Sequence, residues 1–151
     1  MKKIIIISPS ITATHIIKRV IALHQAGFVL EVFAFNRGDG VGGNYPQDVK
    51  VTDLGMVPNG TGYFGKFFRA VSKLRKIFDS YQKEDCMYFV CSFDLALITL
   101  LFSRKKYFYQ ISDLVYGYFP TSLIRSFFKI IDRIIIKRSI ATVVTSEGFI
   151  K

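Results

Sequence analysis

Hydrophobic residues in this chain alternate between short continuous runs and longer stretches with helical spacing. The first run, Ile4–Ile7, contains only β-branched residues, which is typical of a strand buried on both faces of a parallel sheet. Ser8–Ser10 interrupts this run, apolar positions then recur at helical spacing over Ile16–Ala26, and Gly27 supplies a helix stop. Because Val29–Phe35 is again a continuous apolar run, the pattern predicts an opening strand–helix–strand unit.

The same alternation continues to the end of the chain. We predict further strands at Lys50–Leu54, Met87–Cys91, Tyr107–Ile111 and Ala141–Thr145, and further helices at Lys66–Lys83, Leu95–Phe102 and Thr121–Arg138. This order predicts an α/β fold, a Rossmann-like open parallel sheet of about six strands with helices on both faces. A length of 151 residues suits a single domain over 1–151.

The composition limits the classes of protein that the chain can represent. Half of the residues are hydrophobic and only 21% are charged, which is too apolar for a disordered chain. No stretch approaches the ~18 consecutive apolar residues of a membrane-spanning helix. The formal net charge of +10 favours anionic partners such as nucleic acid, acidic lipid headgroups or phosphorylated substrates. We expect no nucleic acid, because no recognised binding motif accompanies the charge.

Several common sites are excluded or disfavoured by the motifs. Cys86 and Cys91 form no CxxC pair, so we expect buried thiols in a reducing cytoplasm. Two histidines without an H-E-x-x-H pattern predict no metal site, and no spacing indicates a covalent hydrolase. Gly38–Gly43 matches G-x-G-x-x-G but follows the second strand rather than the first, so we interpret it as a loop and not a nucleotide site.

Polar residues gather just after the predicted strands, where ligands of open parallel sheets bind. We expect contacts to a substrate from Ser10, Thr12, His15, Ser92, Ser112, Ser146 and Glu147. Ser10 or Thr12 also suits the cap of the first helix, and His15 is interpreted equally well as a surface residue. Asp94 and Asp113 each follow a strand, and each suits either a helix cap or a catalytic base.

Two of the predicted helices carry rows of cations. Arg125, Lys129, Arg133 and Lys137 follow one another at i+4 spacing, although like charges at that spacing repel. Most of the other side chains of that helix are apolar, so it is either buried on two sides or in contact with lipid. The second row, on the helix predicted at Lys66–Lys83, comprises Arg69, Lys73 and Lys76 and follows an aromatic segment. This pattern suits either an anionic membrane surface or a packed helix with a solvated basic face.

Three segments carry a resemblance to a known family. They are Thr14–Arg19 with Leu23–Val29, Tyr109–Leu114, and Ile131–Arg133 followed by Ala141–Glu147. In this order and spacing they resemble the N-terminal domain of GT-B glycosyltransferases of the bacterial family 4 type. The family often has Arg at the position of His15, His at that of Cys91 or Phe93, and His at that of Ser112.

The resemblance implies an enzyme of surface polysaccharide assembly that moves a sugar from a nucleotide donor to a lipid-linked or saccharide acceptor. It implies that 1–151 is the acceptor-side domain and that a donor-binding domain follows Lys151, so this domain alone is expected to be inactive. Because Ser112 stands where the family often has His, the resemblance leaves the catalytic role to Asp113 or Asp94, or to a different catalytic arrangement, and it implies neither a cofactor nor a divalent cation. The expected location is cytoplasmic and peripheral on the inner face of the cell membrane. Two alternatives are a non-catalytic membrane-recruiting subunit of a split glycosyltransferase and a stand-alone nucleotide- or flavin-binding domain.

Overall fold

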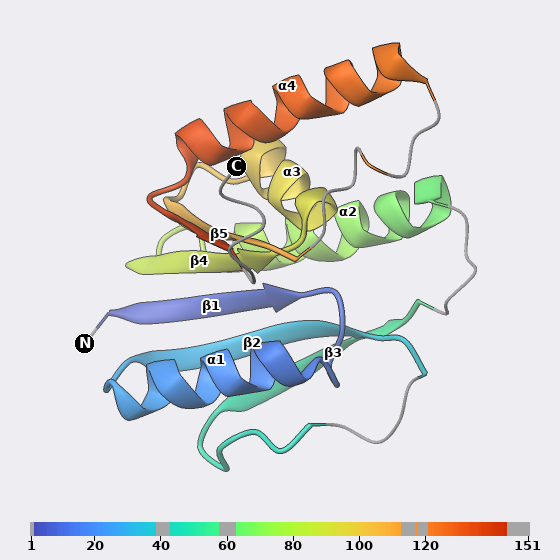
Figure 1. Cartoon of the computed structure of the whole chain (residues 1–151). Helices are drawn as coiled ribbons and strands as arrows, with labels where there is room; N and C mark the ends of the chain where they lie inside the picture. The colour runs from blue at the N-terminus through green and yellow to red at the C-terminus, as the bar shows by residue number, and fades with distance from the viewer. Residues whose placement is uncertain (1, 39–42, 58–62, 113–116, 118–120, 145–151) are drawn as a thin grey trace.

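The computed structural model describes residues 2–38, 43–57, 63–112, 117 and 121–144, and Figure 1 shows their arrangement. The strands are β1 (Lys3–Ser8), β2 (Val29–Asn36), β3 (Lys50–Met56), β4 (Cys86–Cys91), β5 (Tyr107–Ile111) and β6 (Thr142–Val144). The helices are α1 (Thr14–Gln25), α2 (Tyr63–Ser80), α3 (Phe93–Phe102) and α4 (Ser122–Arg138). Each predicted element is present, and the predicted fold class is confirmed.

The six strands form one parallel sheet in the order β3-β2-β1-β4-β5-β6. The chain moves outward from β1 to β3, crosses back over the sheet through α2, and then moves outward in the opposite direction from β4 to β6. The order therefore reverses between β1 and β4. In open sheets of this kind, ligands bind beyond the carboxyl ends of the strands at such a switch point.

The same reversal distributes the helices over the two faces. Crossovers between parallel strands are right-handed, so connections that run in opposite directions place their helices on opposite faces. Accordingly α1 covers one face, where Ile16 and Val20 pack near Ile4 and Ile6, while α2, α3 and α4 cover the other (Figure 1). The face of α1 carries a single helix, and the face of α2 to α4 carries the larger core.

The largest difference from the predicted bounds is in α2, which begins at Tyr63 instead of Lys66 and ends at Ser80 instead of Lys83. The early end has a physical reason, because Tyr81 and Glu84 lie in a turn that leads directly into β4. In this turn the Tyr81 hydroxyl and the Glu84 carboxylate reach across to the amino-terminal ends of β1 and β2. Helical periodicity does not detect such a long-range contact.

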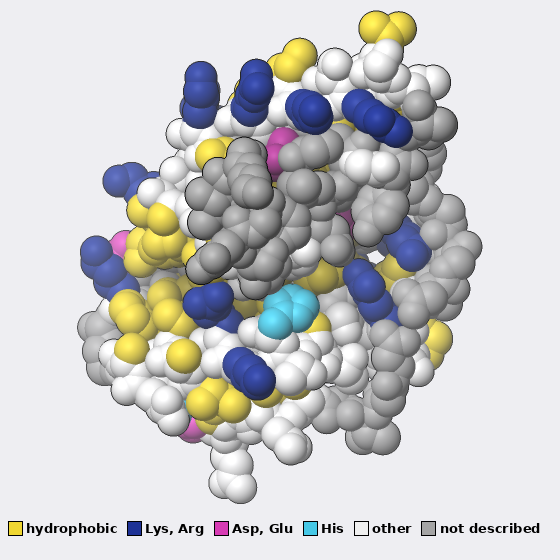
Figure 2. Space-filling model, viewed as in Figure 1, with side chains coloured by type: hydrophobic (Ala, Val, Ile, Leu, Met, Phe, Trp, Pro, Cys, Tyr) yellow, Lys and Arg dark blue, Asp and Glu magenta, His cyan; other side chains and the backbone are white. Residues whose placement is uncertain are grey.

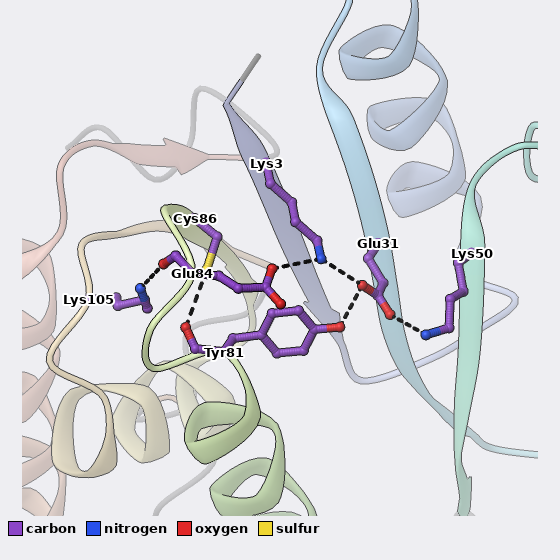
Figure 3. Close-up of polar contacts among 7 residues, drawn as sticks. All are labelled: Lys3, Glu31, Lys50, Tyr81, Glu84, Cys86 and Lys105. Carbon is purple, nitrogen blue, oxygen red and sulfur yellow. Dashed lines mark hydrogen bonds and ion pairs between the residues drawn. The ribbon is translucent and has the colours of Figure 1, made fainter.

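An ion cluster closes the amino-terminal edge of the sheet (Figure 3). The Glu31 carboxylate, buried on β2, lies 3.2 Å from the Lys3 ammonium and 2.8 Å from that of Lys50, and it accepts a 2.6 Å hydrogen bond from the Tyr81 hydroxyl. Lys3 also contacts Glu84 at 3.0 Å. Burial raises the pKa of Glu31, but the hydrogen bonds from Lys50, Tyr81 and Lys3 outweigh burial and leave that pKa below its ordinary value. The cluster thus joins three strands and the end of α2 at the edge opposite the switch point.

Candidate functional site

The switch point brings two strand ends and two helix starts together. β1 ends at Ser8 and is followed by α1, while β4 ends at Cys91 and is followed by α3. Beyond β1 the Ser10 and Thr12 hydroxyls lie 3.0 Å apart, and the Ser10 amide donates to the Ser8 hydroxyl at 3.2 Å. The prediction that Ser10 or Thr12 caps α1 is wrong. The cap position is Ala13, and it makes no side-chain hydrogen bond, because both hydroxyls are engaged within the β1–α1 turn.

The β4–α3 turn has a strained backbone. Ser92 has φ of 97° and ψ of 154°, a conformation that L-residues other than glycine rarely adopt. Its hydroxyl donates to the Asp94 carboxylate at 2.5 Å, and its amide donates to the Gln110 carbonyl on β5 at 3.1 Å. Strain of this kind costs about 1–3 kcal/mol and gathers at functional sites. The turn therefore holds the Asp94 carboxylate in one orientation.

Asp94 is not the cap residue of α3, which is one of the two roles that the sequence allowed for it. The cap position is Ser92, and Asp94 lies inside the first helical turn. A carboxylate there is stabilised by the helix dipole. The same carboxylate also lines a pocket, so the position is compatible with the second role, that of a catalytic base.

A pocket of about 40 Å³ opens at the carboxyl ends of β1 and β2. Its walls come from Pro9, Phe35, Arg37, Val57, Lys66, Ala70, Asp94 and Leu95. Arg37 is fixed there by a 3.0 Å hydrogen bond from its Nε to the Pro9 carbonyl. One carboxylate thus shares a small pocket with two cations. The volume accommodates one or two small groups, such as a hydroxyl or a phosphate oxygen, rather than a whole sugar.

Unpaired polar atoms lie on the α1 face of the sheet, on the other side of the same edge. Gln110 of β5, which is 1% exposed, pairs with Cys91 of β4 in the sheet register. The guanidinium carbon of Arg19 on α1 lies 5.8 Å from the centre of the Phe89 ring on β4. Among the described residues, Arg19 Nε, Gln110 Oε1 and Ser112 Oγ are buried without a hydrogen-bond partner. Buried polar groups ordinarily have partners, so this part of the edge has capacity for another polar group.

The thiol of Cys91 is an unsuitable nucleophile in this setting. Complete burial raises its pKa far above the ordinary value, and the nearby Arg19 offsets only part of that effect. Cys86 is also buried and free, and burial raises its pKa as well. The expectation of buried thiols is therefore confirmed.

The structure brings some of the predicted site residues together and leaves others undescribed. Ser10, Thr12, Ser92, Asp94 and Ser112 follow β1, β4 and β5 at one edge of the sheet. His15 lies in the first turn of α1 with an exposed side chain. Asp113, Ser146 and Glu147, and most of the Gly38–Gly43 loop, lie outside the described residues.

Sequence reasoning did not assign a role to Arg37, Lys66, Arg19 or Gln110. Arg37 directly follows β2, so its place at the ligand-binding edge was accessible from the predicted fold. Lys66 and Arg19 each lie inside a helix, where only the packing decides whether a side chain turns toward the edge. Gln110 interrupts an apolar strand, which is a signal for a buried polar position.

Two common features are absent from the described part of the chain. No group of three or more His, Cys, Asp or Glu side chains there could hold a metal ion. None of its helices is long and apolar enough to cross a membrane.

Comparison with solved structures identifies the fold. The crystal structure of UDP-GlcNAc 2-epimerase from Neisseria meningitidis bound to UDP-GlcNAc matches 96% of this chain with a TM-score of 0.54 and 11% sequence identity. The shared fold is GT-B-like. The chain corresponds to 46% of the length of that enzyme. No protein-family model and no curated protein matches the chain at the level of sequence.

Proposed function

We propose that this chain is the N-terminal, acceptor-side domain of a GT-B glycosyltransferase of the family 4 type. The complete enzyme moves a sugar from a nucleotide donor to a lipid-linked or saccharide acceptor in surface polysaccharide assembly. The observation that carries the proposal is the pocket at the switch point, which Asp94, Arg37 and Lys66 line together within a GT-B-like fold. Such a pocket combines a proton acceptor with binding groups for a phosphate.

In this proposal Asp94 is the general base. As the acceptor hydroxyl attacks the anomeric carbon, its proton passes to the Asp94 carboxylate, and the bond to the nucleoside diphosphate breaks with the electron pair leaving on the phosphate oxygen. A positioned carboxylate contributes about 10²–10⁴-fold to such a step. Ser92 orients the carboxylate through its hydrogen bond, and Arg37 and Lys66 bind a phosphate of the acceptor. Asp113 stays a second candidate for the base.

The acceptor hydroxyls are assigned to the polar groups around the same edge. Ser10, Thr12, His15, Ser92 and Ser112 are the described candidates, and Ser146 and Glu147 stay predictions. In this proposal the nucleotide sugar binds to a second domain of the complete enzyme. The length relation to the epimerase supports this division, because the chain matches slightly less than half of that enzyme.

The test is sugar transfer by the full-length protein, assayed with a panel of UDP-, GDP- and dTDP-sugars and an extract of the lipid acceptors. Asp94→Asn is expected to lower kcat by about 10²–10⁴-fold with little change in KM, since it removes the base and keeps the side-chain volume. The matched control is Asp79→Asn on α2, where the carboxylate is exposed and far from the pocket, and it is expected to leave kcat unchanged. Unchanged transfer by Asp94→Asn contradicts the role of Asp94.

A stand-alone nucleotide- or flavin-binding domain is the second candidate, favoured by the Rossmann order of the strands. Thermal unfolding of the 151-residue chain with FMN, NAD and UDP-sugars separates the two. The acceptor-side proposal predicts no large shift with any of them, because the donor binds to the other domain. A shift that grows with ligand concentration, as expected when a ligand binds the folded state alone, contradicts the proposal and supports the second candidate.

A further inference from the structure

The outer side of α4 combines two parallel features. The first is a line of exposed apolar side chains at i, i+4, i+7 and i+11, called here the outer stripe: Leu123 (83% exposed), Phe127 (60%), Ile130 (56%) and Ile134 (46%). The second is the cation row, Arg125, Lys129, Arg133 and Lys137, which runs beside the stripe and is also exposed. Figure 2 shows Lys and Arg side chains in a row along α4, with apolar side chains beside them.

The rotation of α4 about its axis is set from below, by β5. The Tyr109 hydroxyl donates to the buried Asp132 carboxylate at 3.0 Å, and the Tyr107 hydroxyl donates to the Ile135 carbonyl at 2.9 Å. Phe128 packs against Phe93 of α3 on the same inner side. Because these contacts are made by the inner side of α4, the outer stripe and the cation row both point away from the sheet.

We infer that α4 is a membrane-docking helix, which lies in the plane of an anionic bilayer surface with the outer stripe in the headgroup and acyl boundary and the cation row on lipid phosphates. Interfacial helices have this combination of an apolar face and a Lys/Arg-rich polar face. Cations near such a surface add about 1 kcal/mol each to the binding. The inference names a partner of the proposed function and rests on it for its biological meaning, but the binding itself does not depend on sugar transfer.

Charge complementarity favours lipid over a second copy of this chain. A two-fold contact through the outer stripe places two cation rows close together, which is unfavourable. The chain has 21 Lys and Arg against 11 Asp and Glu, so it offers few acidic side chains to face that row. An anionic bilayer accepts the stripe and the row at the same time.

The structure also separates α4 from the second basic helix. On α2, Arg69, Lys73 and Lys76 are exposed, but α3 lies between α2 and α4. Lys76 belongs to a surface hollow with Lys50 and Thr52 of β3, at the edge of the sheet remote from α4. The α2 cations therefore provide a matched control of equal charge, and membrane contact is assigned to α4 alone.

The first test is flotation with vesicles of phosphatidylcholine containing phosphatidylglycerol, using the full-length protein and the 151-residue chain. Arg133→Glu/Lys137→Glu and, separately, Phe127→Ser/Ile130→Ser are each expected to lower the partition coefficient at least about tenfold. Lys73→Glu/Lys76→Glu changes the net charge equally and is expected to lower it less than about threefold, since those cations lie away from the surface. Circular dichroism confirms that each variant is folded.

The second test uses the absence of tryptophan from the sequence. A single Trp is introduced at Phe127→Trp on α4 or at Met56→Trp on β3, positions that are 60% and 61% exposed. On anionic vesicles, the Phe127→Trp emission is expected to shift to the blue and to be quenched by brominated lipids. The Met56→Trp emission is expected to stay unchanged.

Four outcomes overturn the inference. They are no binding of the unaltered protein to anionic vesicles, equal binding to pure phosphatidylcholine, loss of binding in the α2 variant with retention in both α4 variants, and a dimer that Phe127→Ser dissociates. Binding by the 151-residue chain without binding by the full-length protein also overturns the inference, because the outer stripe is then not available for docking in the full-length protein. Vesicle binding without sugar transfer leaves the docking helix intact and contradicts only the proposed function.

Discussion

At the scale of single residues, Ser92 is the clearest link between backbone strain and chemistry. Its φ of 97° is the only positive value among the described residues other than glycine. Three glycines share that region of backbone space without strain, so a glycine at position 92 would fit as well. The serine hydroxyl is what glycine cannot supply, because it binds the Asp94 carboxylate. The strained residue thus serves to orient Asp94.

We therefore predict that Ser92→Gly changes stability little and lowers activity strongly. The substitution removes strain of about 1–3 kcal/mol and gives up one hydrogen bond and some chain entropy, so the free energy of unfolding is expected to change by less than about 1 kcal/mol. Sugar transfer by the full-length protein is expected to fall at least about tenfold, since Asp94 loses its orienting partner. Urea unfolding and kcat measure the two effects. A large loss of stability with unchanged kcat would show that Ser92 is only structural.

At the scale of elements, the sequence predicted the strands and helices well but not their orientations. Continuous runs such as Ile4–Ile7 and Tyr107–Ile111 identify buried strands because period and burial agree locally. The side of α4 that faces the sheet was not predictable in this way, since apolar residues surround most of that helix. Two tyrosines of β5 decide it through hydrogen bonds that span more than twenty residues of sequence.

The candidate site shows the same contrast between positions that the sequence predicts and orientations that only the packing decides. Asp94 and Ser92 were predictable because they directly follow a strand whose carboxyl end belongs to the binding edge. Lys66 and Arg19 were not, because each reaches the edge from within a helix. The prediction that Ser10 or Thr12 caps α1 was wrong for a related reason. The two hydroxyls form a hydrogen bond with each other, so neither is bonded to the first amides of the helix.

The two tyrosine contacts beneath α4 are expected to differ in strength. Tyr109→Phe leaves the buried Asp132 carboxylate without that donor, and the free energy of unfolding is expected to fall by about 1–3 kcal/mol. Tyr107→Phe removes a donor to a neutral backbone carbonyl, and the expected loss is about 0.5–1.5 kcal/mol. Urea unfolding of both variants measures the difference. If Tyr107→Phe is the more destabilising variant, Asp132 does not anchor α4.

At the scale of the whole molecule, the two ends of the parallel sheet have different tasks. The carboxyl ends carry the strained turn, the charged pocket and the unpaired Gln110 Oε1 and Ser112 Oγ atoms. The amino ends carry the Glu31 cluster, in which the charged groups are paired. Parallel strands make this separation possible, since all the strands begin at one edge and end at the other. A change at the amino-terminal edge should therefore alter stability and leave the site unaffected.

The stability that the Glu31 cluster contributes depends on pH. The pKa of Glu31 in the folded state lies below its ordinary value of 4.5, so its contribution is complete above about pH 4.5 and is lost as the pH falls through the folded pKa. The pKa of Lys3 is raised above 10.5: burial lowers it, but the hydrogen bonds to Glu84 and Glu31 and the charges of both carboxylates outweigh burial. The Lys3 contribution is accordingly complete below that pH and is lost as the pH rises through the folded pKa.

Glu31→Gln is expected to lower the free energy of unfolding at pH 7 by about 2 kcal/mol, because hydrogen bonds to a charged group become hydrogen bonds to a neutral one. Below pH 4.5 the difference from the unaltered protein should shrink, since the acid already neutralises Glu31 there. Urea unfolding across pH 3–7 tests this convergence, with Asp79→Asn as the exposed control. Vesicle binding and sugar transfer should be unchanged under conditions where the variant is folded. A loss of either function in folded Glu31→Gln would mean that the two edges of the sheet are coupled, and that the amino-terminal cluster also helps to shape the site.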